Sequence, residues 1–199
     1  MISPQLTQIL RNIDNSKKIL ILTHQDPDAD AFGSTRAISY SLQLISKKTT
    51  LIYVYYHRPL RTFKPEETVL SADHPNAKKK LATLLKQDQL VLHYLNPAGD
   101  ELSIHGNLFD YALILDTNYS DHSITGLIFE SEPKKGVGSI DHHVRSHPIK
   151  NPDQDYNQPR KSSASEIVYQ IIPQILNLHK KYSLPLDLSY LKQLLNTQK

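Results

Sequence analysis

The chain has 199 residues, of which 39% are hydrophobic and 22% are charged, so it holds enough apolar material for one ordinary core. It contains no cysteine, which excludes disulfides, thiolate metal sites and a cysteine nucleophile. The formal net charge of +3 suits a polyanionic substrate but falls short of the basic density of a dedicated nucleic-acid binder. No segment approaches the roughly 20 apolar residues of a membrane span, so we expect a cytoplasmic protein without a membrane partner.

Five short runs of β-favouring apolar residues predict strands that are buried on both faces of a parallel sheet. They are residues 18–24, 50–56, 90–94, 111–116 and 136–143. Apolar positions at helical spacing predict helices between these strands, over residues 31–46 and 76–87. The alternation predicts an α/β, doubly wound domain that has a mostly parallel sheet with helices on both faces.

The last third of the chain has a different pattern. Residues 145–162 are rich in Pro, Asn, Asp, Gln and Lys, which predicts a surface loop. A capping box at 163–166 predicts the start of a helix that continues along the apolar run to Leu178. Pro173 should kink or split that helix, and a short final helix is expected over residues 186–195.

The first charged cluster follows the first predicted strand. Within seven residues it contains one histidine and three aspartates, His24, Asp26, Asp28 and Asp30. These groups must crowd one loop, where their mutual repulsion costs stability unless a cation offsets it. An acidic turn with one helix-capping aspartate is the simpler alternative, but it explains only one of the three. We expect Gly33 and Ser34 in the first turn of the next helix, whose free N–H groups favour a substrate phosphate.

Two further strands end in clusters of the same kind. Asp116 follows the run at 112–115, and Asp141, His142 and His143 follow Ile140. Taken alone, an aspartate after a strand is more often a loop or cap residue, and a histidine pair is usually a surface or core feature. In doubly wound sheets, however, ligands bind at the carboxyl ends of the strands, where all three clusters fall. Their convergence predicts a metal and phosphate site at this edge.

A histidine with paired aspartates, a strand-end aspartate and then Asp-His-His, in this order, resembles the DHH phosphoesterase superfamily over roughly residues 16–170. The spacing and the Ser-Ser-Ala-Ser-Glu stretch at 162–166 look most like the bacterial nanoRNase branch, which combines oligoribonuclease and phosphoadenosine-phosphate (pAp) phosphatase activities. The resemblance implies a hydrolase that cleaves short oligoribonucleotides, related nucleotides or pAp with two divalent metal ions. Oxygen and imidazole ligands favour manganese, with magnesium or cobalt as alternatives.

The resemblance also implies a role for each matched residue. The ligands of one metal would be His24 and Asp28, those of the second would be Asp30 and His142, and Asp116 would bridge both. Of the catalytic pair, His143 would face the substrate phosphate and Asp141 would orient the histidines. Arg145 joins Gly33 and Ser34 as a substrate-contact candidate because its planar guanidinium matches phosphate oxygens.

The sequence departs from that superfamily near its end. The fourth motif, a further metal-ligating aspartate, has no clear counterpart before Lys199, and Asp187 lies in no matching context. We expect residues 1–199 to form the DHH N-terminal domain, with its motifs in 18–143 and closing helices in 163–199, and with the C-terminal substrate-binding domain absent. The chain would then be a fragment, a degenerate copy, or a short form that a partner or homodimer completes.

Several functions stay open. The same motifs serve inorganic pyrophosphatases and single-strand exonucleases of that superfamily, because a fold does not settle which chemistry it hosts. An incomplete ligand set also suits a metal- or nucleotide-binding module without turnover. The aromatic and basic stretch at 53–58 invites contact with bases and phosphates, but a buried strand that leads into a solvated loop is the simpler interpretation.

Overall fold

The computed structural model describes residues 2–57, 62–117, 125–144 and 150–178. Its helices are α1 (Pro4–Asp14), α2 (Ala29–Leu44), α3 (Ala77–Leu84) and α5 (Ala164–Asn177), with short 3-10 turns η1 (Gly106–Leu108) and η2 (Pro152–Gln154). Its strands are β1 (Lys18–Leu22), β2 (Lys48–Tyr55), β3 (Thr68–Ser71), β4 (Gln89–Leu95), β5 (Leu102–His105), β6 (Tyr111–Leu115), β7 (Leu127–Ser131), β8 (Val137–Asp141) and β9 (Asp155–Asn157). The helix expected over 186–195 lies outside the described residues.

Seven of the strands form one sheet in the order β3-β4-β2-β1-β6-β8-β9, and every described pairing in it is parallel. Ile21 of β1 is in register with Leu51 of β2 on one side and with Leu113 of β6 on the other. All five residues of β6 are buried, as both-face coverage requires. The predicted α/β, doubly wound fold with a mostly parallel sheet is confirmed.

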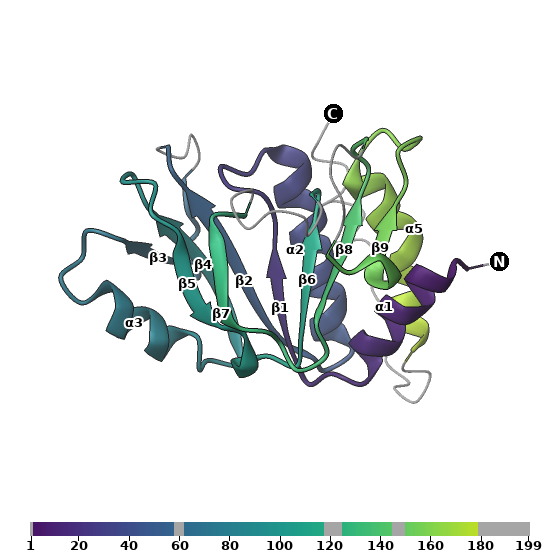
Figure 1. Cartoon of the computed structure of the whole chain (residues 1–199), viewed down its shortest axis with the longest axis horizontal. Coiled ribbons are helices and arrows are strands. Elements are labelled where there is room, and N and C mark those ends of the chain that lie inside the picture. Colours follow the sequence, from purple (N-terminus) through teal and green to yellow (C-terminus); the bar gives the residue numbers. More distant parts are fainter. Residues whose placement is uncertain (1, 58–61, 118–124, 145–149, 179–199) are drawn as a thin grey trace.

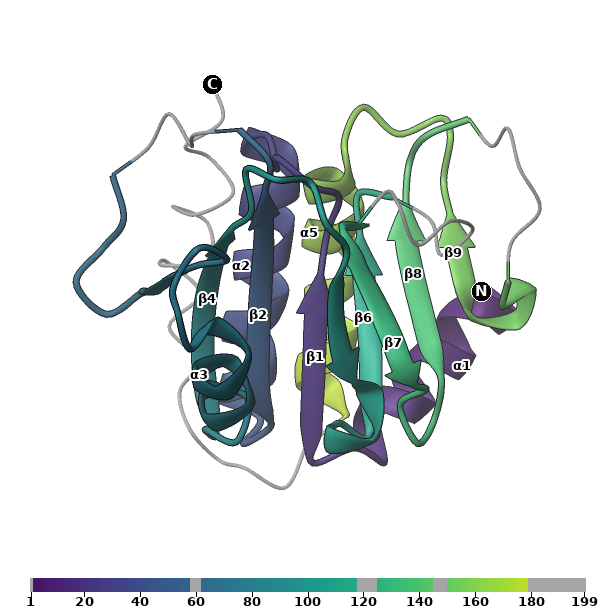
Figure 2. The same ribbon diagram turned by 60° about the vertical axis from the view of Figure 1, so that its left-hand side comes forward.

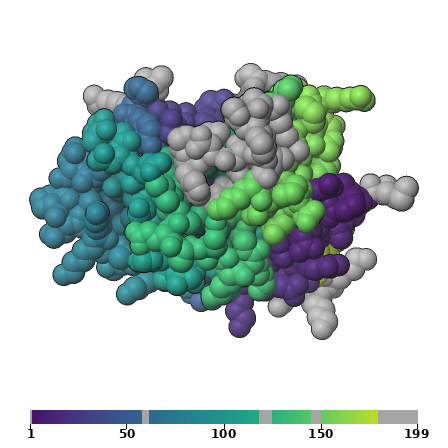
Figure 3. Space-filling model, in the orientation of Figure 1, coloured from purple at the N-terminus to yellow at the C-terminus, as the bar shows by residue number. Residues whose placement is uncertain are grey.

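The two faces of the sheet have different covers (Figure 1, Figure 2). Because successive strand residues point to opposite faces, Ile19 and Ile21 enter one core while Leu20 and Leu22 enter the other. Helices α1, α2 and α5 pack on the first core. Helix α3 and a two-stranded parallel sheet of β5 and β7 pack on the second, so helices do cover both faces. In Figure 3, α1 and α3 lie at opposite ends of the molecule.

Three local expectations need correction. Helix α2 begins at Ala29 rather than at residue 31, because the Asp28 side chain caps it by accepting a hydrogen bond from the Ala31 N–H. The predicted loop at 145–162 contains a strand, β9, which pairs with β8. Helix α5 runs unbroken past Pro173, since its buried isoleucines hold it against the core. Within the described residues, no helix has the length and apolarity to cross a membrane.

Candidate metal centre

The centre lies where three neighbouring parallel strands end. Strands β1, β6 and β8 are adjacent in the sheet, so their carboxyl ends meet at one edge. His24 lies just beyond β1, Asp116 directly follows β6, and His142 directly follows β8. The sheet thus brings together clusters that are far apart in the chain.

Asp116 is the common member of these contacts. Its Oδ2 lies 3.7 Å from Nε2 of His24, and its Oδ1 lies 3.2 Å from Nε2 of His142 and 3.9 Å from Nδ1 of His143. The residue is only 2% exposed and has a left-handed φ of 60°, which aspartate tolerates better than most residues. This backbone turn follows the last residue of β6 and aims the carboxylate at the histidines of both neighbouring strands.

Among the described residues, the candidate ligands fall into two groups that share Asp116. One group is His24, Asp28 and Asp116, and the other is Asp116, His142 and His143. Within each group the candidate ligand atoms all lie within 4.8 Å of one another. Oxygen and imidazole donors in such sets suit a divalent metal ion. The first group is the set expected for one metal.

The electrostatics of Asp116 also fit a cation. Burial raises the pKa of Asp116, and the neighbouring carboxylates of Asp30 and Asp28 add to that rise, although contact with His24 opposes it. Its Oδ1 is buried and accepts no well-formed hydrogen bond from any described residue. A buried acceptor without a donor is costly unless something else satisfies it. A divalent ion at this atom would do so.

Asp30 lies beside His142, as expected, and also makes contacts that the sequence does not predict. Its Oδ2 accepts a hydrogen bond from the Ala164 N–H at 2.7 Å, and its Oδ1 accepts one from the Ser165 N–H at 2.9 Å. The side chain thereby caps the first turn of α5, a role that sequence spacing did not reveal. Asp30 Oδ2 also lies 3.7 Å from Nε2 of His142, so the carboxylate sits at the margin of the second ligand group.

Asp141 holds the histidine pair. It is fully buried, and its Oδ1 accepts hydrogen bonds from the backbone N–H groups of His142 at 2.8 Å and His143 at 3.2 Å. The same oxygen lies 2.7 Å from Nδ1 of His143. Burial opposes protonation of His143, but the hydrogen bond with Asp141 and the negative charges of Asp141 and Asp116 together outweigh it and raise the pKa of that imidazole. The carboxylate therefore fixes the orientation of the His143 ring.

The expectation that Gly33 and Ser34 occupy the first turn of a helix is wrong. Helix α2 begins at Ala29, so both residues lie in its second turn, where backbone N–H groups are used within the helix. Ser34 is fully buried, and its hydroxyl donates to the Ala31 carbonyl. Neither residue therefore lies among the free N–H groups at the start of α2, on which the expected phosphate contact depends. Arg145 lies outside the described residues.

Asp26 serves the loop rather than the ligand groups. With a left-handed φ of 48°, it accepts hydrogen bonds through Oδ1 from the N–H groups of Tyr56 and His57, both at 3.0 Å. Its Oδ2 lies 2.7 Å from Nδ1 of His57. Asp26 therefore fastens the ligand loop to the end of β2. Sequence alone placed Asp26 in the acidic cluster but gave no signal for His57 as its partner.

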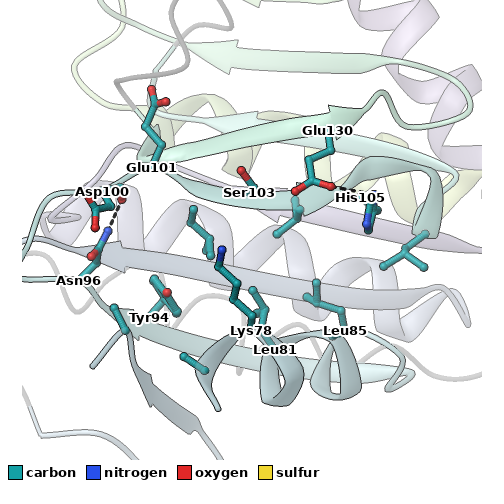
Figure 4. A pocket seen from close by; sticks show the side chains of 16 residues that line it. Lys78, Leu81, Leu85, Tyr94, Asn96, Asp100, Glu101, Ser103, His105 and Glu130 are labelled. Atoms are coloured by element: carbon teal, nitrogen blue, oxygen red, sulfur yellow. Dashed lines mark hydrogen bonds and ion pairs between the residues drawn. The ribbon is translucent and has the colours of Figure 1, made fainter. Parts of the chain in front are cut away.

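A cavity between α3 and β5 lies apart from the metal centre (Figure 4). It has a volume of about 620 Å³ and is lined by apolar side chains such as Leu81 and Leu85, with Lys78, Glu101 and His105 at its polar rim. None of the candidate metal ligands lines it. The chemistry predicted from the sequence therefore belongs to the strand ends and not to this cavity.

Comparisons with known proteins identify the family and the fold. A family model described as the DHH family, N-terminal domain, matches residues 18–195. The structure is similar to a crystal structure of an exopolyphosphatase-related protein from Bacteroides fragilis, with a TM-score of 0.52 and 16% sequence identity. The match covers 97% of this chain and 56% of that one, so the chain spans little more than half the length of that relative. Among curated proteins, no match was found.

Proposed function

The chain belongs to the DHH family, which indicates a metal-dependent phosphoesterase, and we propose that it hydrolyses short oligoribonucleotides, related nucleotides or pAp with two divalent ions. The observation that carries the proposal is the shared position of Asp116 in both ligand groups. A carboxylate with two oxygens can contribute to two neighbouring ions, which is the arrangement of two-metal phosphoester hydrolysis. The ligand types favour manganese.

Each described residue at the centre has a defined task in this proposal. His24 and Asp28 would hold one ion, His142 and Asp30 would hold the other, and Asp116 would serve both. When bound, such ions stabilise the charge of a phosphate group and lower the pKa of a water molecule. Nδ1–H of His143 donates to Asp141, so Nε2 can donate to a substrate phosphate oxygen when the imidazole is doubly protonated.

Hydrolysis of pyrophosphate or polyphosphate is the second candidate. The solved relative is described as exopolyphosphatase-related, and phosphoanhydrides need the same charge stabilisation as phosphate esters. A third alternative is a module that binds metal and nucleotide without turnover. The three alternatives differ in the product released, so they can be separated by one assay.

The test is product release by the purified 199-residue chain after metal removal and addition of Mn²⁺. The substrates are RNA of two to five nucleotides, pAp, pyrophosphate and polyphosphate. The proposal predicts metal-dependent turnover of RNA or pAp, with Asp153→Asn as a control because Asp153 is an exposed carboxylate outside the centre. Turnover of pyrophosphate or polyphosphate alone would establish the second candidate. Bound Mn²⁺ without any turnover would establish the third.

A further inference from the structure

A small cavity lies at the carboxyl ends of β2, β3 and β4, beside the metal centre. It has a volume of about 190 Å³, and we call it the strand-end pocket; its lining residues are Tyr55, Tyr56, His57, Ser71, Leu95, Asn96 and Pro97. We propose that the strand-end pocket binds the base of a nucleotide whose phosphate lies at Asp116. The proposal rests on the proposed function and specifies its substrate class as a nucleotide rather than a bare phosphate chain.

The register of the sheet places this pocket level with the metal ligands. Tyr55 of β2 pairs with Leu95 of β4, and Leu95 pairs with Ser71 of β3, so the pocket forms where these three strands end together. Strand β2 is the neighbour of β1, and β1 is the neighbour of β6, which ends at Asp116. Two strand spacings of about 4.8 Å separate β2 from β6, or roughly 10 Å. A substrate of one or two nucleotides can bridge that gap.

The wall of the pocket is also bonded directly to the ligand loop. Asp26 lies between the ligands His24 and Asp28, and its N–H donates to the Val54 carbonyl at 2.9 Å. Its carboxylate receives the N–H groups of Tyr56 and His57 and holds the His57 ring through Nδ1. The position of the His57 ring is therefore fixed relative to the first ligand group, as a two-point substrate site requires.

The chemistry of the lining suits a base and not a phosphate. The rings of Tyr56 and His57 lie in the lining with Leu95 and Pro97, whereas the Tyr55 side chain is buried in the first core. The His57 side chain is 88% exposed while Asp26 fixes its orientation. Flat rings of this kind stack on any base, because every base has a π-face. A phosphate chain would find no cationic side chain among these residues except a protonated His57.

The side-chain oxygen of Asn96 is a further polar group to consider beside the strand-end pocket. The residue is 2% exposed, and its Nδ2 donates to the Asp100 carbonyl (Figure 4). Its Oδ1 is buried and accepts no hydrogen bond from the described part of the chain. Such an acceptor is costly to leave unsatisfied. Because this oxygen is shielded from solvent and Asn96 also lines the cavity between α3 and β5, a base in the strand-end pocket reaches it only if the Asn96 side chain rotates.

The test compares two ligands that differ only in the base. Binding of AMP and of ribose 5-phosphate to the full chain is measured by calorimetry with Mn²⁺ present. We expect AMP to bind roughly tenfold more tightly or better, and His57→Ala to remove most of that preference, which is the size of effect that loss of one stacking ring produces. His57→Phe keeps a flat ring and should keep most of the preference. His105→Ala is the matched control, since His105 is also exposed but lies at the end of β5 outside the strand-end pocket.

The outcomes separate this proposal from the proposed function. Equal binding of the two ligands, no detectable AMP binding, or an undiminished preference in His57→Ala would each overturn the base pocket. An AMP preference that depends on residue 57 supports the pocket even if no phosphate ester is hydrolysed, and in that case only the catalytic proposal fails. Turnover of short RNA without any base preference would leave the catalytic proposal standing and reject the pocket.

Discussion

The carboxylate of Asp30 accepts a hydrogen bond from the backbone N–H of Ala164 at 2.7 Å, which joins the start of α2 to the start of α5. The helix that carries part of the acidic motif is thereby tied to the helix that closes the first core. The same carboxylate borders the second ligand group through His142. Asp30 therefore has a structural task that can be measured without metal.

We predict that Asp30→Ala lowers the free energy of unfolding by about 1–3 kcal/mol in the absence of metal, because two N–H groups at the start of α5 lose their acceptor. Urea denaturation in EDTA measures this loss. Asp30→Asn keeps one acceptor oxygen and should lose less. Equal metal-free stability of Asp30→Ala and the wild type would show that the capping contact contributes nothing.

A second prediction concerns acid stability. Burial opposes ionisation of Asp110, but hydrogen bonds from the N–H groups of Lys17 and Lys18 and the ammonium of Lys134 outweigh it and lower the pKa to about 2. A lowered folded-state pKa gives stability that is present above the unfolded pKa of about 3.9 and is lost as pH falls towards 2. Asp110→Asn should cost about 1 kcal/mol at pH 7 and flatten the stability profile between pH 4 and 2. An unchanged profile in denaturation curves across this range would contradict the assignment.

The affinity of the centre for Mn²⁺ should fall as the pH is lowered. Contact with Asp116 raises the pKa of His24 above its ordinary value, and burial raises the pKa of Asp116. Both groups must lose their protons to bind a metal, so a raised pKa means that protons compete at higher pH. We predict that apparent Mn²⁺ affinity weakens steadily from pH 8 to pH 6. A titration series that gives the same dissociation constant at both ends would refute this competition.

A substitution at Gly138 of β8 would test the packing beneath the metal centre. A Cβ at this position would collide with the hydroxyl of Tyr111 and would lie 3.2 Å from the backbone oxygen of Gln154. We predict that Gly138→Ala costs about 1–3 kcal/mol of stability, as overpacking in a core does. Combining it with Tyr111→Phe should recover part of that loss, because phenylalanine lacks the hydroxyl. Strictly additive effects in this double-mutant cycle would show that the collision is not the cause.

The strands and the edge at which their charged ends meet could be predicted from the sequence. Runs such as 111–115 are continuously apolar because they are buried on both faces, so their pattern is strong. The small sheet of β5 and β7 could not be found in the same way, since β5 is short and only alternately buried. Strand β9 was missed because its residues, Asp155–Asn157, have a polar turn-like composition and pair only at the sheet edge.

The candidate site likewise contains residues that the sequence predicts and contacts that it does not predict. A histidine or aspartate that ends a buried strand is visible in sequence, so His24, Asp116 and His142 were all identified. The hydrogen bonds of Asp26 to His57 and of Asp30 to α5 join segments that are distant in the chain, and no local pattern encodes them. The apolar spacing begins at residue 31 and so places Gly33 and Ser34 in the first turn, whereas the Asp28 cap starts the helix at Ala29 and puts them in the second.

In the proposed function, hydrolysis of a phosphate ester depends on metal ions that Asp116 would hold. Asparagine tolerates the left-handed backbone of this position, and removing a buried charge should leave metal-free stability unchanged or higher. The most direct measurement is therefore the initial rate of Mn²⁺-dependent cleavage of a ribodinucleotide by the wild type and by Asp116→Asn, with folding checked by circular dichroism. We predict that the initial rate falls by at least about 100-fold in Asp116→Asn. Loss of a residue that only orients a metal ligand typically costs about 10- to 100-fold, so a larger fall indicates a direct ligand. A folded Asp116→Asn protein that cleaves the dinucleotide at the wild-type rate would contradict the account.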